Sequence, residues 1–306
     1  MKELKTCTFN LENFFLVQTE HVENPLAYKS LDKIKWIANV IEEIDADIYL
    51  LTEVGTEDSL HYFNDKYLDS KYHVSVIRGN TNRGIEIGFL INKRLPFHYS
   101  HFTYKNHSLG FKYENTEEDG PFEKMSRDIA ELHIKDPKTE EVLFICLLVH
   151  LKSKLDKDGI DPEGNYRREA EANLLAKAYK KLEEQFPKVP KLIAGDFNNT
   201  LSDSTNWELQ ALRDLEMKDI LELLDLPDHM KATHVHFPHQ EPAKFYQLDY
   251  ILLHPLLWNR INPEQSGVYR YKDQHGNRMG LPTEHYHRYG LPSDHYPVVA
   301  TFSWKL

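Results

Sequence analysis

The sequence has 306 residues, of which 41% are hydrophobic, and its formal net charge is −11. This length suits one large domain, which we expect to span residues 1–306. No run of about 18 apolar residues occurs, so we expect no membrane span. No signal peptide precedes the first strand-like run, so we expect a cytoplasmic protein.

Two features of the composition limit the functional class. The cysteines, Cys7 and Cys146, are too few for a disulfide scaffold, and we expect two free, buried thiols. Proteins that hold nucleic acid through charge alone are usually basic. With a net charge of −11, a polynucleotide substrate would require metal ions and a local basic patch. The acidity favours a small or transiently held substrate.

The first half of the chain alternates short apolar runs with one helical pattern. A helix is predicted after Ser30, a possible N-cap, where apolar residues from Leu31 to Ile44 recur at helical spacing. Short apolar runs rich in β-forming residues predict strands on both sides of it. The strands expected up to residue 149 are 4–10, 48–51, 72–77, 85–92, 129–134 and 142–149.

The second half repeats this pattern. A helix is predicted over 165–186, with Ala170, Leu174, Ala178 and Leu182 on one face, and strands over 191–194, 247–253 and 297–304. Many strands with few inserted helices indicate two packed sheets with helices on their outer faces. The segments 105–125, 154–165, 227–244 and 262–292 are expected to be long loops.

The polar residues that could carry chemistry lie where predicted strands end or begin. In a two-sheet sandwich these ends gather at one rim, where carboxylates, amides and imidazoles can bind a hard cation and transfer protons. Taken singly, each has an ordinary explanation: a capping Glu53, a turn at Asp196 or a core His150. The set comprises Asn10, Glu12, Glu53, His150, Asp196, Asn198, Asp249, Asp294 and His295.

The order of these residues resembles the endonuclease/exonuclease/phosphatase superfamily, which has the fold of pancreatic-type deoxyribonuclease. The resemblance runs from Phe9-Asn10-Leu11-Glu12 to Ser293-Asp294-His295-Tyr296-Pro297. It implies a four-layer α/β sandwich of two mainly antiparallel sheets flanked by helices. It also implies hydrolysis of phosphate esters that depends on Mg²⁺ or Mn²⁺.

The resemblance assigns a role to each matching residue. Asp249 is expected to hold His295, which would act as the general base or as an imidazole that stabilises the phosphate. Asp196 and Asn198 would orient the nucleophile and contact the phosphate. The expected metal ligands are Glu53, Asn10, Asp294 and, as a less certain match, Glu12. Asn10 is also expected to help hold the substrate phosphate.

His150, Glu86 and Arg127 indicate a branch of the superfamily. His150 and Glu86 fall where deoxyribonuclease-like and sphingomyelinase-like members carry a histidine and the glutamate that orients it. Arg127 resembles the arginine that binds the substrate phosphate, and Lys152 follows His150 closely enough to contact a polyanion. We therefore expect two histidine–carboxylate pairs, Asp249–His295 and Glu86–His150, on opposite faces of the phosphorus.

The activity that we expect is a nuclease acting on DNA or RNA, with no obligate protein partner. A phosphomonoesterase or a sphingomyelinase-like lipid phosphodiesterase on the same fold stays open, because fold does not fix substrate. A non-catalytic binding module would lack site residues, and none is missing here. A zinc site remains a further alternative, since His234, His236, His239, His285 and His287 are clustered in sequence.

Overall fold

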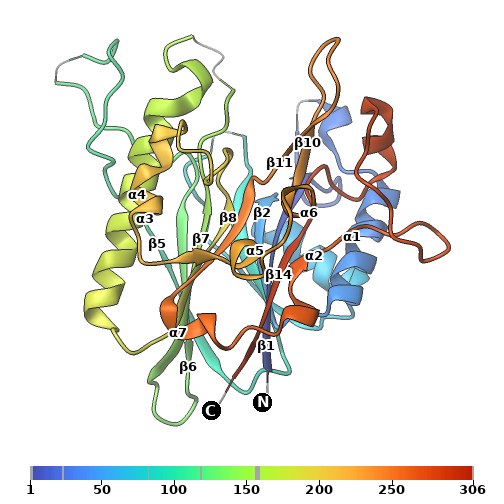
Figure 1. Ribbon diagram of the computed structural model, residues 1–306, viewed down its shortest axis with the longest axis horizontal. Helices are drawn as coiled ribbons and strands as arrows, with labels where there is room; N and C mark the ends of the chain where they lie inside the picture. Colours follow the sequence, from blue (N-terminus) through green and yellow to red (C-terminus); the bar gives the residue numbers. More distant parts are fainter. Residues whose placement is uncertain (1–2, 23, 82, 118, 156–158, 305–306) are drawn as a thin grey trace.

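Two six-stranded sheets pack face to face, and helices cover their outer faces (Figure 1). The computed structural model describes residues 3–304 except 23, 82, 118 and 156–158. Both sheets are mixed, because β1–β2 and β7–β8 are parallel pairs and the remaining pairs are antiparallel. The expected sandwich of two mainly antiparallel sheets is confirmed.

Each sheet combines strands that are consecutive in sequence with strands that are far apart in the chain. The first sheet has the order β13-β14-β1-β2-β4-β3 and the second β5-β6-β7-β8-β12-β9. The first contains β1 (Glu3–Phe14), β2 (Ile48–Val54), β3 (Tyr72–Val76), β4 (Glu86–Asn92), β13 (Gly267–Val268) and β14 (Val298–Ser303); the second contains β5 (His98–Thr103), β6 (Ile129–Lys135), β7 (Val142–His150), β8 (Lys191–Asp196), β9 (Lys218–Asp219) and β12 (Asp249–Leu253).

Helices lie on both outer faces of the sandwich. Figure 1 shows α1 and α2 beside the first sheet and α3 and α4 beside the second. A two-stranded ribbon, β10–β11, lies at the end of the molecule opposite the labelled chain ends. The helices are α1 (Leu31–Ile44), α2 (Glu57–Tyr67), α3 (Asn165–Gln185), α4 (Gln210–Arg213), α5 (Ile220–Leu223), α6 (Asp228–Lys231) and α7 (Pro255–Trp258), and the ribbon consists of β10 (His234–His236) and β11 (Lys244–Tyr246).

The central strands are apolar on both faces because they separate two cores. In β2, Tyr49 and Leu51 pack against the helices of the first sheet, whereas Ile48 and Leu50 pack between the sheets. This alternation follows from the two-residue period of a strand. It explains why these strands read as continuous apolar runs. Both cysteines lie in such strands, buried and unpaired as expected.

Elements without apolar periodicity were not predicted. Helix α2 begins at the Thr56 N-cap, whose side chain accepts from the Ser59 amide, and buries Leu60 and Phe63 as its apolar residues. Strand β5 is a polar edge strand that is mostly half-buried. The expected loops 227–244 and 262–292 also contain α6, β10 and β13, so that expectation was wrong in part. Strand β10 pairs with the nearby β11, whereas β13 pairs with β14 at the end of the chain.

None of the helices in the described part of the chain is long and apolar enough to cross a bilayer.

Gly195 fixes the approach of β8 to β7. Its φ is +134°, and a Cβ at this position would lie 1.9 Å from the carbonyl oxygen of Val149. We expect Gly195→Ala to lower the free energy of unfolding by about 3 kcal/mol, through steric overlap and backbone strain. Gly110→Ala is the control, since Gly110 has φ +65° with nothing within 4 Å. It should cost only about 1 kcal/mol in chemical denaturation. Equal losses would contradict the steric argument.

Candidate active site

A buried hydrogen bond joins His295 to Asp249. The Nδ1 atom of His295 lies 2.7 Å from Oδ2 of Asp249, and both residues are buried. His295 precedes β14 of the first sheet, and Asp249 begins β12 of the second. The pair therefore links the two sheets at their shared rim and leaves Nε2 of His295 for other partners.

Opposed environments set the protonation of His295 and Asp196. Burial disfavours the charged imidazole, but the carboxylates of Asp249, Asp196 and Asp294 outweigh it and raise the pKa of His295 well above its ordinary value. Burial also raises the pKa of the Asp196 carboxyl, and Asp249 adds to that effect while His295 opposes it. The pKa values of the imidazole and of the neighbouring carboxyl are therefore both raised, and the two groups can form an acid–base couple.

Asn10 makes a second link between the sheets. Its Nδ2 donates to Oδ2 of Asp196 at 3.0 Å, and its main-chain oxygen accepts from Oγ of Ser293 at 2.7 Å. Asp196 also accepts from the Asn198 amide at 2.8 Å, while the Asn198 side chain donates to the Leu151 carbonyl. The structure thus brings Asn10, Asp196 and Asn198 together, as the sequence led us to expect.

His150 lies beside Asp196 but is not paired with Glu86. The parallel register places His150 opposite Asp196, with 3.6 Å between Nε2 and Oδ2 of these residues. Nδ1 of His150 is buried without a hydrogen-bond partner, and Glu86 accepts instead from the Gly79 amide at 2.7 Å. The expected Glu86–His150 hydrogen bond is therefore absent among the described residues. Burial, with Arg127 and His295, lowers the pKa of His150.

Irregular backbone brings Glu53 to the rim. The ladder between β1 and β2 shifts register between Asn10 and Phe14. Glu53 and Asn13 both have left-handed backbones, with φ of 56° and 49°. The Asn13 amide donates to Oε2 of Glu53 at 2.7 Å. Such conformations cost energy for side chains other than glycine and are concentrated at functional sites.

Asp294 has a cation as its partner. Its Oδ2 accepts from Arg288 at 2.6 Å, and Nε2 of His234 lies 3.9 Å away. Ligand atoms of His234, Asp294 and His295 lie within 4.8 Å of one another, as do those of Asp196, Asp249 and His295. Sequence reasoning treated His234 as a loop residue. Its His-x-His alternation was the available signal for a strand.

Two expected site residues have other partners. Oε2 of Glu12 accepts from Lys29 at 3.1 Å and Lys33 at 2.7 Å, so its carboxylate belongs to an ion-pair cluster. Nζ of Lys152 donates to the carbonyls of Ser153 and Leu155. These partners come from the surrounding loops and helix, and the local sequence pattern does not reveal them.

Arg127 is buried and has no carboxylate within ion-pair distance in the described residues. It is 8% exposed and donates through Nη1 to the Leu151 carbonyl at 3.2 Å. Burial lowers its pKa, whereas the charges of Glu171, Glu53 and Asp196 act in the opposite direction. A desolvated guanidinium without a salt bridge has the character of an anion-binding group.

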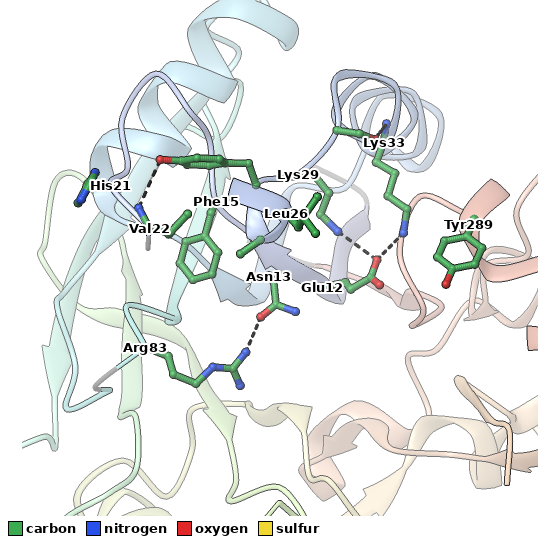
Figure 2. Close-up of a pocket in the computed structure, with 13 residues that line it drawn as sticks. Glu12, Asn13, Phe15, His21, Val22, Leu26, Lys29, Lys33, Arg83 and Tyr289 are labelled. Atoms are coloured by element: carbon green, nitrogen blue, oxygen red, sulfur yellow. Dashed lines mark hydrogen bonds and ion pairs between the residues drawn. The ribbon is translucent and has the colours of Figure 1, made fainter. Parts of the chain in front are cut away.

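A cavity of about 760 Å³ lies beside the rim, along the segment after β1 (Figure 2). Figure 2 shows Lys29 and Lys33 directed at Glu12, and Arg83 at the side-chain oxygen of Asn13, 2.7 Å away. Asn13 also donates its amide to Glu53, so this residue contacts both the cavity and the candidate site. Its lining residues are Glu12, Asn13, Phe15, His21, Val22, Leu26, Ala27, Tyr28, Lys29, Ser30, Lys33, Arg83 and Tyr289.

Comparison with known proteins agrees with this geometry. The sequence model of the Endonuclease/Exonuclease/phosphatase family matches residues 7–295. Truncated TDP2 from Caenorhabditis elegans aligns with a TM-score of 0.64 at 18% identity, covering 99% of this chain and 98% of that one. The human nocturnin catalytic domain aligns with a TM-score of 0.62 at 15% identity, covering 99% of this chain and 94% of that one.

An endonuclease/exonuclease/phosphatase family protein from Bacteroides thetaiotaomicron gives a TM-score of 0.62 at 18% identity, covering 99% of this chain and 96% of that one. At these identities the likeness concerns the fold, and it confirms the expected deoxyribonuclease-like sandwich. No curated protein has a matching sequence.

Removing the Asp249 charge tests the electrostatics of the rim. We expect Asp249→Asn to lower the pKa of His295, measured by NMR titration of metal-free protein, because the principal raising charge is lost. A raised histidine pKa adds stability that is complete below the unfolded value of about 6.5 and is lost as pH rises through the folded value. The variant's deficit in unfolding free energy should therefore shrink towards alkaline pH.

The control for this substitution is Asp219→Asn, another buried aspartate, which hydrogen bonds to Gln247. It should leave the pKa of His295 unchanged. An unchanged His295 titration in Asp249→Asn would refute the assigned cause.

Proposed function

Because this chain belongs to the Endonuclease/Exonuclease/phosphatase family, whose members are generally phosphoester hydrolases, we propose that it is a divalent-metal-dependent phosphodiesterase. A nuclease of DNA or RNA is the activity we propose first. The observation that carries the proposal is the buried Asp249–His295 pair beside Asp196, Asn10 and Asn198. These residue types suit proton transfer and phosphate binding at one point.

The donor set suits Mg²⁺ or Mn²⁺. Asp196, Asp249 and Asp294 surround a single imidazole and all act on its pKa, and Glu53 also acts on Asp196. Oδ1 of Asp249 is buried without a hydrogen-bond partner. Such an excess of oxygen donors and negative charge favours a hard cation. When bound, the ion would offset phosphate charge and stabilise the leaving oxygen.

The residues proposed to hold the cation are Glu53, Asn10 and Asp294. Asp294 would have to exchange its Arg288 partner for the ion. Glu12 is left out of the proposed set, because Lys29 and Lys33 already occupy its carboxylate. Lys152 is likewise left out of substrate binding, because loop carbonyls hold its ammonium group.

His295 and Asp196 are assigned different roles in the proposed reaction. His295 is held as an imidazolium by its carboxylate neighbours, so we assign to it the stabilisation of phosphate charge through Nε2. Asp196, whose pKa is raised by burial, is assigned to receive the proton of the attacking water. This assignment makes His295 the phosphate-stabilising imidazole and no longer the general base.

We assign the contacts on the opposite side of the substrate phosphate to Arg127, Asn198 and His150. The Arg127 guanidinium and the Asn198 amide share the Leu151 carbonyl as acceptor, which fixes their relative positions. His150 is kept neutral by burial and by Arg127. Its Nε2 therefore donates or accepts according to its tautomer. We no longer assign Glu86 to orient His150. We assign it instead to holding the loop at Gly79, which packs against the main chain of Arg127.

The cavity supports a substrate larger than a simple phosphate ester. The cavity is lined by three cations, Lys29, Lys33 and Arg83, and by one carboxylate, that of Glu12, in a chain with a net charge of −11. This local positive charge is what a polyanionic substrate requires of an acidic protein. Phe15 and Tyr289 add ring surface on which a base can stack.

A lipid phosphodiesterase is the second candidate. The β10–β11 ribbon, at the end of the molecule opposite the labelled chain ends, exposes Phe245 and Tyr246, at 46% and 37%. Exposed aromatic side chains on a ribbon can enter a membrane interface. Comparing oligonucleotides with sphingomyelin vesicles as substrates separates the two candidates.

The activity is tested with His295→Ala. We expect metal-dependent hydrolysis of single-stranded DNA, RNA or bis-p-nitrophenyl phosphate by the natural chain. The variant should lose about 100- to 10,000-fold in kcat, because a charge that acts in the transition state is removed. His61→Ala, an exposed change on α2, serves as the control. Full activity of a folded His295→Ala variant, with folding verified by circular dichroism, would contradict the role assigned to His295.

The cavity is tested with Arg83→Ala. We expect KM for an oligonucleotide to rise about 5-fold, equivalent to about 1 kcal/mol, and KM for bis-p-nitrophenyl phosphate to stay constant. The dependence of KM on salt should flatten, because one phosphate contact is lost. Arg260→Ala removes the same charge beside the last strand and is the matched control. Parallel effects on both substrates would show that the cavity does not hold the extended substrate.

A further inference from the structure

His234 is an imidazole with unused binding capacity. Its side chain is 18% exposed, and its ring centroid lies 4.7 Å from that of His295. Nδ1 is buried without a hydrogen-bond partner in the described residues, and Nε2 lies 3.9 Å from Oδ2 of Asp294, beyond hydrogen-bond distance. Leaving a buried polar group without a hydrogen-bond partner costs free energy. Such a group calls for an explanation, and an ion is one.

The backbone holds His234 in place without any help from its side chain. His234 and His295 form an isolated β-bridge, and the Tyr296 amide donates to the Thr233 carbonyl at 2.8 Å. Oγ1 of Thr233 accepts from the Asp249 amide at 3.0 Å. The strand that carries His234 is thus fixed to the same segments that carry His295 and its carboxylate partner. The imidazole is preorganised.

The geometry points to a second cation site, formed by His234, Asp294 and His295, that binds Zn²⁺ and thereby blocks the hydrolytic centre. Ligand atoms of the three residues lie within 4.8 Å of one another. Two imidazoles and one carboxylate are a ligand set for Zn²⁺, with water in the remaining position. Mg²⁺ prefers oxygen ligands, so the proposed Glu53–Asn10–Asp294 site and this one, which share Asp294, differ in the ion that they select.

The surroundings of the three ligands fit this assignment. Nδ1 of His295 is taken by Asp249 at 2.7 Å, which leaves Nε2 as the ligand atom, and Zn²⁺ binding there displaces the Nε2 proton into solvent. A carboxylate on the far nitrogen is the arrangement that orients a zinc-binding histidine. Arg288 opposes the ion, because its guanidinium occupies Oδ2 of Asp294 at 2.6 Å. Removing that guanidinium should therefore strengthen Zn²⁺ binding.

The inhibitory half of the inference rests on the proposed function. An ion on Nε2 of His295 removes the nitrogen that is assigned to the phosphate. The binding half stands independently, since it depends only on the three ligands. Histidines that are neighbours in sequence but not part of the three-ligand group, such as the exposed His236, contribute nothing.

Binding is measured by titrating the metal-free chain with Zn²⁺ in excess Mg²⁺, using isothermal titration calorimetry. We expect one saturable site in the natural chain. His234→Asn should weaken it on the order of 10- to 100-fold, the loss seen when a group that supports a metal is removed. Arg288→Ala should tighten it, and His236→Asn, the matched control on the same strand, should leave it unchanged.

The outcomes separate the possibilities. Equal affinity in His234→Asn and the natural chain overturns the site, and so does an equal loss in His236→Asn, which would place Zn²⁺ on the ribbon alone. If His234→Asn proves unfolded in thermal melting, Arg288→Ala decides, and unchanged or weaker binding refutes the proposal.

Inhibition is then scored against the zinc-free rate of each variant. Zn²⁺ that binds without inhibiting overturns the inhibitory half. A chain that binds Zn²⁺ as expected but hydrolyses none of the substrates leaves the site standing and refutes the proposed function instead.

Discussion

The hydrogen bond between Asp249 and His295 is the interaction on which the rim depends. It joins the start of β12 in one sheet to the segment that leads into β14 in the other, and the Asn10–Asp196 hydrogen bond makes the same crossing. Two buried polar links between sheets fix the separation of the groups that surround them. Because burying these groups is favourable only when they are paired, the links also specify how the sheets align.

The sequence was most informative where a polar residue ended an apolar strand. Asn10, Asp196, Asp249 and His295 do meet, because strand ends converge in any packed sandwich. It was least informative about side-chain partners. Glu86 and His150 lie on strands of different sheets, and packing directs Glu86 to the Gly79 amide. The same limit applies to helix α2, whose polar sequence folds against a core that the other strands supply.

Negative and positive side chains lie in separate regions of the rim. Carboxylates gather around His295, whereas Lys29, Lys33 and Arg83 line the adjoining cavity. Asn13 stands between the two regions, since its amide binds Glu53 and its side chain accepts from Arg83. The cavity therefore offers positive charge to the proposed anionic substrate. At the acidic centre, a bound cation would have to offset the repulsion between the substrate and the carboxylates.

The irregular segment between β1 and β2 has a mechanical consequence. The ladder between β1 and β2 is intact at Asn10–Thr52 and resumes at Phe14–Val54, so residues 11–13 and Glu53 form an irregular insert clamped on both sides. Main-chain pairing at each end resists shear, while the insert itself is held by side chains. We therefore expect this segment to deform more easily than the strands on either side of it. When an ion or a phosphate pulls on Glu53, the displacement is absorbed within a few residues, and the sheets on either side transmit almost none of it.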